Sequence, residues 1–302
     1  MIFLTGASGY VGMRVGERLA GRSRRVRCLV LPDDPVDPGN RFPTQVVRGD
    51  LRDPDSFAAY GDGVNAIVHA ASATPSASAE DLDDVNVRGT AHMIEFARQW
   101  KVGRFVYVSA AAAVSAPASP YGAAQAEAER LVAASGLDYT ILRPTMVYGP
   151  DGAGDFRTLV TLVQSFPLLS PLPGSGSARL QPVYIGDFVR AVELVLSNAA
   201  ARGKTYNVSG ASIVRMRELV ARIADAEGLR RLPVPVPMIL CRATAAALRM
   251  AVPSSVFRPD AILGLAHDAA LDHTPLREEC GYEPLTLEAG FARVFGGGAS
   301  LR

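Results

Sequence analysis

Thr5-Gly6-Ala7-Ser8-Gly9-Tyr10-Val11-Gly12 carries the strongest structural signal in this chain of 302 residues. It follows a short apolar run, Ile2 to Leu4, and opens a segment of helical pattern, Val11 to Ala20. Its three glycines allow a tight strand-to-helix turn, close approach of backbone N–H groups to a pyrophosphate, and close packing of the helix on a sheet. The helix dipole favours the same anion. The stretch predicts a dinucleotide-binding turn, and a glycine-rich turn without a ligand is the alternative.

Apolar, β-branched runs recur along the first half of the chain, and helical or turn-rich segments separate them. Strand alternating with helix predicts right-handed crossovers and an α/β fold of Rossmann type, a doubly wound, mainly parallel sheet with helices on both faces. Further helices are expected from Glu80 to Trp100 and from Ala123 to Ala134, and a later strand at Lys204 to Val208. The six runs are Ile2–Thr5, Val26–Leu31, Gln45–Arg48, Ala66–His69, Phe105–Ser109 and Tyr139–Leu142.

The composition changes after Pro144, where proline and glycine cluster and proline-punctuated apolar segments fill residues 232–265. Such a discontinuous region does not easily form a core of its own, so we expect a smaller C-terminal lobe that folds over the carboxyl ends of the strands. The expected division is a dinucleotide-binding core, 1–150, and a mainly substrate-binding lobe, 151–302, with segments returning to the core. The longest apolar stretch, Val234 to Val252, is interrupted by two arginines and is expected to be a buried or groove-lining helix.

Charge and cysteine content exclude several classes of protein. A net charge of +1 gives no field for nucleic acid or an anionic membrane. The apolar, proline-rich residues 232–265 favour a small hydrophobic molecule as the partner, and the expected state is a monomer or homodimer. Cys28, Cys241 and Cys280 are odd in number and widely spaced, which favours neither disulfides nor zinc. The four histidines show no ligand spacing, and no metal is expected. With the glycine turn beginning at residue 5, we expect no secretory leader and a cytoplasmic protein.

A set of motifs, in this order and spacing, resembles the extended branch of the short-chain dehydrogenase/reductase superfamily, the NAD-dependent epimerase/dehydratase type. The resemblance covers almost the whole chain. The matching pieces are Thr5-Gly6-x-x-Gly9-x-x-Gly12, Gly49-Asp50-Leu51, Val68-His69-Ala70-Ala71, Asn86-Val87-Arg88-Gly89-Thr90, Phe105-Val106-Tyr107-Val108-Ser109, Tyr121, Leu142-Arg143-Pro144, Tyr148-Gly149-Pro150, Pro182-Val183-Tyr184-Ile185-x-Asp187 and Cys280-Gly281-Tyr282-x-Pro284.

The resemblance implies NAD or NADP as cofactor and assigns residues to each part of it. The pyrophosphate falls to Gly6, Ala7, Ser8, Gly9, Tyr10 and Val11, and the adenine to Asp50 and Leu51. Ala70, Ala71 and Ser72 would border the ribose, and Pro144, Met146 and Val147 the nicotinamide. Ser109, Tyr121 and Gln125 complete the expected cofactor-binding set.

Leu31 stands at the position that separates NAD from NADP in such proteins, and it offers neither a carboxylate for a ribose 2′-hydroxyl nor a cation for a 2′-phosphate. Asp33 or Asp34 would serve NAD, and Arg52 would serve NADP. We therefore expect weak discrimination or dual use.

The catalytic set departs from the family's pattern, in which a tyrosine passes the proton, a lysine four residues later lowers the tyrosine's pKa, and a serine or threonine just beyond the fifth strand fixes the carbonyl. Tyr121 is present, but Gln125 stands at the lysine position and Ala110 to Ala113 follow Ser109. A tyrosine ordinarily titrates near pH 10, so an uncharged neighbour leaves its phenolate scarce. Tyr121 remains the catalytic candidate, with passive packing on the nicotinamide ribose as the alternative.

These observations favour an atypical ketoreductase that reduces a bulky, hydrophobic ketone, such as an aromatic polyketide, with NAD(P)H. A phenol beside the ketone would polarise the carbonyl and supply the proton. The lost residues resemble the pattern in atypical ketoreductases of angucyclinone biosynthesis, of the simocyclinone type. Two alternatives are a non-catalytic NAD(P)-binding sensor or accessory subunit, and a nucleotide-sugar epimerase or dehydratase.

Overall fold

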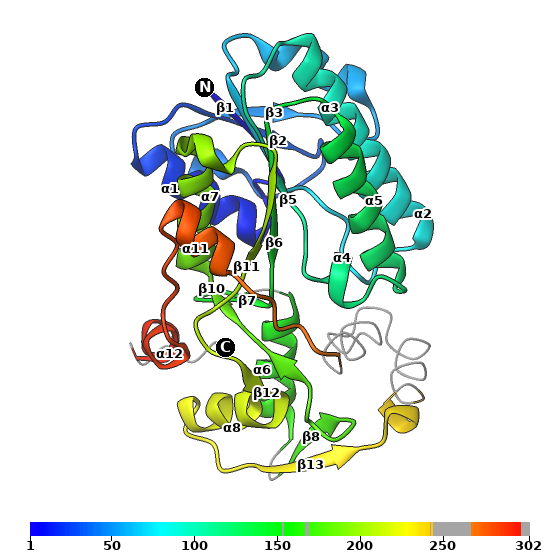
Figure 1. The fold of residues 1–302 in the computed structure, drawn as a ribbon. Coiled ribbons are helices and arrows are strands. Elements are labelled where there is room, and N and C mark those ends of the chain that lie inside the picture. The colour runs from blue at the N-terminus through cyan, green and yellow to red at the C-terminus, as the bar shows by residue number, and fades with distance from the viewer. Residues whose placement is uncertain (153, 167–168, 242, 244–266, 297–302) are drawn as a thin grey trace. The chain divides into compact units, whose positions relative to one another are not determined.

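The computed structural model describes residues 1–296 apart from 153, 167–168, 242 and 244–266 (Figure 1). The chain divides into two compact units. The first comprises Met1–Pro144, Ile185–Val208 and Asp272–Tyr282, and the second comprises Thr145–Tyr184, Ser209–Leu271 and Glu283–Arg302. The chain crosses between the units several times, so neither unit is one continuous stretch of sequence.

A seven-stranded sheet forms the centre of the first unit, in the order β11-β6-β5-β4-β1-β2-β3. Every neighbouring pair is parallel, and the register sets Thr5 beside Leu29 and His69. The predicted doubly wound α/β fold is confirmed. The strands are β1 (Ile2–Thr5), β2 (Val26–Val30), β3 (Gln45–Arg48), β4 (Ala66–His69), β5 (Phe105–Val108), β6 (Tyr139–Pro144) and β11 (Lys204–Val208).

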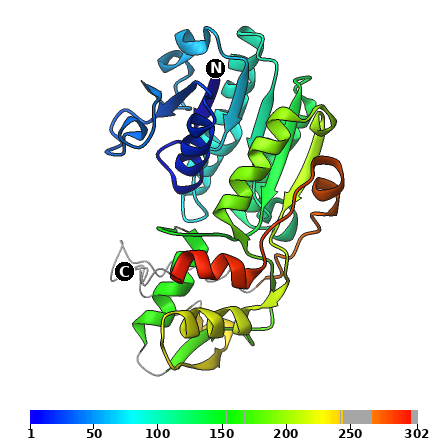
Figure 2. The ribbon, with the colours of Figure 1, turned by 90° about the vertical axis from the view of Figure 1, so that its left-hand side faces the viewer.

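Helices cover both faces of this sheet. On one face α1 (Tyr10–Gly21) packs beside α7 (Ile185–Ser197), and Figure 2 shows this pair in front of the strands. On the other face α3 (Gly89–Gln99) packs beside α5 (Pro120–Ala134). The short helices of the unit are α2 (Ala79–Asp81), α4 (Ala112–Ser115) and α11 (Thr274–Cys280).

The helix expected from Glu80 to Trp100 is divided into α2, a π-helical stretch over Leu82–Arg88, and α3. π-Helical turns often occur at functional sites. Here the widened turn contains Asn86, which is almost fully buried and holds the loop after β4.

The second unit has a hydrophobic core of its own, contrary to our expectation. Tyr148, Phe156 and Phe291 meet there with ring centroids 5.2–6.0 Å apart, beside Leu219 and Ile223. Proline content misled the prediction, because residues far apart in sequence supply this cluster. Its elements are α6 (Gly154–Ser165), α8 (Met216–Ala226), α12 (Leu287–Phe295) and three two-stranded ribbons: β7 (Val147–Tyr148) with β10 (Val183–Tyr184), β8 (Leu169–Pro173) with β13 (Leu232–Val236), and β9 (Arg179–Leu180) with β12 (Val214–Arg215).

The helix expected over Val234 to Val252 lies largely outside the described residues. Of its described part, Val234–Val236 belong to β13, which pairs with β8 in a two-stranded sheet, whereas residues 238–241 are helical as expected. Prolines at 233 and 235 explain the difference, because proline disfavours a helix interior but is tolerated in an edge strand. Across the part of the chain that is described, no helix is long and apolar enough to cross a membrane.

Two α1 glycines provide a matched test of the packing at the N-terminus of this helix. A Cβ on Gly12 would lie 2.1 Å from the Gly6 carbonyl oxygen, whereas a Cβ on Gly21 would meet nothing within 4 Å. We expect Gly12→Ala to lower the free energy of unfolding by about 1–3 kcal/mol. Gly21→Ala is the control, and we expect it to raise stability by up to about 1 kcal/mol. Chemical denaturation measures both, and equal stabilities would contradict the packing described here.

Candidate active site

The glycine turn follows β1 at the carboxyl edge of the sheet. Gly6 has a φ of +70°, and a Cβ there would lie 2.6 Å from the carbonyl oxygen of Ala70. Gly9 donates its N–H to the Gly6 oxygen at 3.0 Å and precedes α1 without a side-chain cap. The first-turn N–H groups of α1 are therefore uncapped by a side chain and suited to phosphate oxygens. The expected pyrophosphate residues are contiguous: Gly6, Ala7, Ser8 and Gly9 form this turn, and Tyr10 and Val11 begin α1.

A buried hydrogen-bond chain fixes the loop after β4 against that turn. Thr5 Oγ1 accepts the N–H groups of Ala70 and Ala71 at 3.2 and 3.1 Å, so its own proton goes to Nδ1 of His69, 2.7 Å away. His69 Nε2 must then carry a hydrogen, which it donates to Thr90 Oγ1 at 3.1 Å. Burial lowers the pKa of His69 to about 3, consistent with this neutral tautomer. Thr5 thus couples the glycine turn to Ala70 and Ala71, the expected ribose border.

Asn86 holds the next part of the same loop. Its Oδ1 accepts the N–H of Ala73 at 2.7 Å, and its Nδ2 donates to the Ala73 carbonyl at 3.4 Å. Because Asn86 is buried and engaged by backbone, it fixes the position of Ser72 and Ala73 and does not face a reactant.

At the expected adenine site, Asp50 and Leu51 follow β3. Leu51 is buried, and the Asp50 carboxylate binds the Arg52 guanidinium at 2.6–3.1 Å. Arg52 thereby holds the pKa of Asp50 below its usual range. The arginine expected to serve a 2′-phosphate is thus engaged by a carboxylate in this structure.

The turn after β2 brings Arg48 to the same region, a cation that the sequence analysis missed. Arg48 donates to the carbonyl oxygens of Leu31 and Asp34, at 3.2 and 2.8 Å. The Asp34 carboxylate accepts the N–H of Val36 at 2.9 Å, and the Leu31 side chain is 48% exposed. Leu31, Asp33 and Asp34, which are expected to contribute to the choice between NAD and NADP, therefore lie in one turn that Arg48 ties to β3.

The centre of the site is the Gln125 amide on α5, which is 1% exposed. Its Nε2 donates to the Tyr121 hydroxyl at 2.9 Å and to Ser72 Oγ at 3.1 Å, while its Oε1 accepts the hydroxyl proton of Tyr107. Three elements meet there: the loop after β4, strand β5 and the first turns of α5. Both N–H groups of the amide already have hydrogen-bond partners. A ribose contact for Gln125 stays a prediction, and it requires a ribose hydroxyl to replace one of these two partners.

The hydroxyl hydrogen of Ser109 is used within the protein, and its contact with the cofactor stays a prediction. Ser109 donates to the buried Glu129 carboxylate, which also accepts two nitrogens of Arg143. Of the alanines after it, Ala112 and Ala113 begin α4, which lies so close to α5 that a Cβ on Gly122 would be 2.6 Å from the Ala112 oxygen. Ala110 to Ala113 thus offer only methyl groups where the family's carbonyl-fixing hydroxyl is expected.

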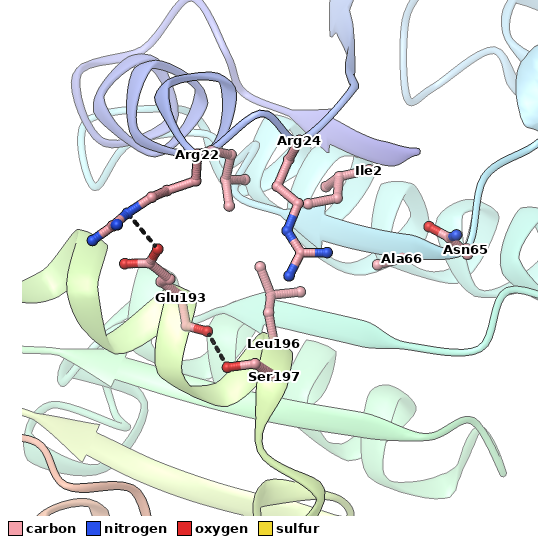
Figure 3. Close-up of a pocket in the computed structure, with 9 residues that line it drawn as sticks. Ile2, Arg22, Arg24, Asn65, Ala66, Glu193, Leu196 and Ser197 are labelled. Carbon is pink, nitrogen blue, oxygen red and sulfur yellow. Dashed lines mark hydrogen bonds and ion pairs between the residues drawn. The ribbon is translucent and has the colours of Figure 1, made fainter.

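The two lysines lie at the opposite edge of the sheet. Lys101 precedes β5, and Lys204 begins β11, where its Nζ pairs with Glu279 at 2.6 Å. Tyr121 begins α5 at the carboxyl edge, so neither lysine replaces the missing cation. A cavity of about 290 Å³ also lies at the amino edge, between the C-terminal ends of α1 and α7 (Figure 3). Its arginines, including Arg22 paired with Glu193 at 3.2 Å, suit the negative ends of these helices.

Three expected nicotinamide neighbours divide between the units. Pro144 ends β6 in the first unit, whereas Met146 and Val147 belong to the second. Their contact with a nicotinamide stays a prediction. Among the described residues, no group of three His, Cys, Asp or Glu side chains is arranged to hold a metal ion.

The sequence pattern of the NAD dependent epimerase/dehydratase family matches residues 2–209, and the chain belongs to this family. Its members are NAD-dependent oxidoreductases, and the site just described supplies the turn that such enzymes need for a dinucleotide.

Three curated relatives extend over most of the chain. A ceramide reductase from Caulobacter vibrioides is 31% identical over 91% of this chain and 84% of its own. A 2-alkyl-3-oxoalkanoate reductase from Stenotrophomonas maltophilia is 27% identical, covering 97% and 98%. A 3 beta-hydroxysteroid dehydrogenase/Delta 5-->4-isomerase from Mycobacterium tuberculosis is 26% identical, covering 94% and 86%.

Solved structures agree on the fold. The protein gox2253 superposes with a TM-score of 0.79 at 21% identity, covering 98% of this chain and 97% of its own. A dTDP-glucose 4,6-dehydratase from Streptomyces venezuelae, solved with NAD bound, has a TM-score of 0.76 at 25% identity, covering 98% and 96%.

The buried neutral His69 predicts a pH dependence of stability. Its ordinary pKa is 6.5 and its folded pKa about 3, so below pH 6.5 only the unfolded chain gains this proton, and stability is lost as pH falls. Between pH 7.5 and 5 we expect this residue to account for a loss of about 2 kcal/mol. His69→Gln removes that part of the loss, whereas the exposed His267→Gln keeps it. Denaturant unfolding at the two pH values measures the difference, and equal losses in both variants would rule out this role of His69.

Proposed function

We propose that this protein is a reductase of bulky, hydrophobic ketones that uses NAD(P)H and takes the proton from the substrate. The observation that carries the proposal is the neutral Gln125 amide, hydrogen-bonded to Tyr121 where the family uses a cation. An intact glycine turn supports binding of the dinucleotide, whose chemistry when bound is the supply of a hydride to a carbonyl carbon. We infer that the first unit binds the dinucleotide and the second supplies most substrate contacts.

The protein lacks a strong proton donor for the ketone oxygen, and in this proposal the substrate supplies the proton itself. Tyr121 without a cation is a weak acid and a scarce base near pH 7, and Ala110 to Ala113 provide no hydroxyl to polarise the ketone. A ketone with an enol or phenol beside it carries an internal hydrogen bond. The acidic O–H gives its proton to the carbonyl oxygen as hydride reaches the carbon, and water then returns a proton to the substrate's own oxyanion.

The relatives support the substrate class. The names of the three curated relatives refer to a ceramide, a 2-alkyl-3-oxoalkanoate and a hydroxysteroid, each with a long or fused hydrocarbon skeleton. Carried to this chain, that common property favours a large apolar ketone, and an aromatic polyketide with a phenol beside the ketone meets both requirements.

A nucleotide-sugar substrate is the second candidate, because a dTDP-glucose 4,6-dehydratase shares the fold. Incubation with dTDP-glucose or UDP-glucose and catalytic NAD distinguishes it, since a new sugar nucleotide would displace the reductase proposal. Tight NAD(P) binding without turnover of either substrate class would identify a sensor or accessory subunit instead.

Tyr121→Phe tests the source of the proton. For a ketone with a neighbouring phenol, we expect kcat to fall by about tenfold or less, the value of one neutral hydrogen bond. For a matched ketone without an acidic neighbour, wild type and variant alike should be slower by at least about 10²-fold. Tyr139→Phe, at the amino edge of the sheet, is the control. Loss of all activity on the phenolic ketone in Tyr121→Phe would make Tyr121 the proton donor and end the substrate-assisted mechanism.

Leu31 predicts weak discrimination between the cofactors. We expect kcat/KM for NADH and NADPH to agree within about tenfold in the wild type. Leu31→Asp should favour NADH, because a carboxylate accepts from the 2′-hydroxyl and repels a phosphate, and Leu31→Arg should favour NADPH. Initial rates with each cofactor measure this, and an unchanged ratio in both variants would place the deciding contact elsewhere.

A further inference from the structure

We propose that His92 is a positioning residue for the adenine end of the dinucleotide, on which it acts through the peptide between Leu51 and Arg52 and through the Asp50 carboxylate. The inference rests on the expected place of the adenine beside Asp50 and Leu51. It goes beyond the proposed function, because it concerns the cofactor alone and holds for any substrate.

The His92 ring reaches the loop after β3 from the first turn of α3. Its Nδ1 lies 2.6 Å from the carbonyl oxygen of Leu51. A carbonyl oxygen only accepts, so Nδ1 carries the hydrogen and donates it. Leu51 is buried and His92 is half-buried, so this bond is partly shielded from water.

Gly89 explains how α3 comes so close to this loop. It begins α3 three residues before His92, so the two residues lie on the same side of the helix. A Cβ on Gly89 would lie 3.0 Å from the Cβ of Leu51. In the same turn, Thr90 Oγ1 accepts Nε2 of the buried His69 at 3.1 Å. The first turn of α3 is therefore attached both to the loop after β3 and to the end of β4.

The peptide between Leu51 and Arg52 connects His92 to a charged group. His92 binds the oxygen of this peptide, and the peptide N–H, which belongs to Arg52, donates to Asp50 Oδ1 at 2.9 Å. Rotation of the peptide would break both bonds together. The Arg52 guanidinium binds the same carboxylate at 2.6–3.1 Å. The orientation of the Asp50 carboxylate is thus set by a peptide that His92 holds.

The Asp50 carboxylate can accept a further donor. An ionised carboxylate offers about four acceptor positions, and Arg52 supplies three donors: its backbone N–H, Nε and one terminal nitrogen. Arg52 holds the pKa of Asp50 below its usual range, so the carboxylate is ionised at neutral pH and acts only as an acceptor. Its side chain is 20% exposed and stays open to a ligand. The amino group of adenine suits this place, whereas a carbonyl oxygen there would be repelled.

Two dinucleotides that differ at this base test the orientation without any ketone. Nicotinamide hypoxanthine dinucleotide carries a carbonyl where NAD carries the adenine amino group. We expect the wild type to bind NAD about tenfold more tightly, the effect of one hydrogen bond to a charged acceptor. His92→Leu removes the donor to the Leu51 carbonyl and should reduce this preference to about twofold or less, chiefly by weakening NAD. Isothermal titration calorimetry measures both dissociation constants.

Three control variants separate positioning from general damage. His92→Asn should keep the wild-type preference, because the amide nitrogen of asparagine is as many bonds from Cα as Nδ1 of histidine. The exposed His267→Leu should leave both dissociation constants unchanged. In Asp50→Ala the preference should already be lost, and the addition of His92→Leu should change the ratio no further.

The ratio of the two dissociation constants decides the outcome. If His92→Leu weakens both dinucleotides equally, or keeps the tenfold preference, the proposal is overturned and His92 has only a structural role. A wild type that binds both dinucleotides equally would remove the adenine amino group from Asp50 and overturn it as well. None of these results bears on the proposed reductase function, which is tested with ketones and fails or stands by itself.

Discussion

The close approach of three backbone segments at Gly6 is the constraint on which the site depends. A Cβ at residue 6 would lie 2.6 Å from the Ala70 oxygen, and a Cβ at residue 12 would lie 2.1 Å from the Gly6 oxygen. These contacts bring the loop after β1, the start of α1 and the loop after β4 together. The Thr5 to His69 to Thr90 chain then fixes the loop after β4 in register. Because Ser72 belongs to this loop, the position of the Gln125 amide follows from the packing of two glycines.

Polar residues along one face of α5 lie next to the loop that follows β4. Tyr121, Gln125 and Glu129 follow one another at intervals of four residues, so they lie on one side of the helix. The Gln125 amide accepts from the Tyr107 hydroxyl and donates to the Tyr121 hydroxyl. The Glu129 carboxylate accepts hydrogen bonds from Ser109 and Arg143. Glu129 is thus one turn beyond the neutral Gln125 amide along α5, and Arg143 of β6 neutralises its charge. An uncharged Tyr121 environment is a property of the whole face and not of one substitution.

The sequence predicted the sheet, the glycine turn and the absence of a cation beside Tyr121, because each depends on local patterns: apolar runs, glycine spacing and residue type. It did not predict that Tyr107 would contact Gln125, since a tyrosine within an apolar strand looks like core. The spacing could have predicted this contact. Tyr107 and Ser109 are two residues apart at the end of β5 and so point to one side, and Gln125 and Glu129 are four residues apart and share one side of α5. The core of the second unit was also missed, since Tyr148 and Phe291 meet only through tertiary packing.

In the proposed mechanism the substrate supplies the proton because no cation stands at residue 125, and the size of the missing electrostatic effect can be stated. A unit charge about 4 Å from a phenolate contributes about 4 kcal/mol at an effective dielectric constant near 20, which equals about three pKa units. A lysine at residue 125 would therefore bring a tyrosine from near pH 10 to near pH 7, whereas an amide contributes one neutral hydrogen bond of about 1 kcal/mol. Without the charge, only about one phenol in a thousand is ionised at pH 7, and a phenol with this higher pKa is a weaker general acid toward the oxygen of a ketone as the alkoxide develops. For the reductase proposed above, a substrate O–H more acidic than Tyr121 would restore the rate without any change in the protein, so acidity beside the ketone is the property that the proposal requires of the substrate.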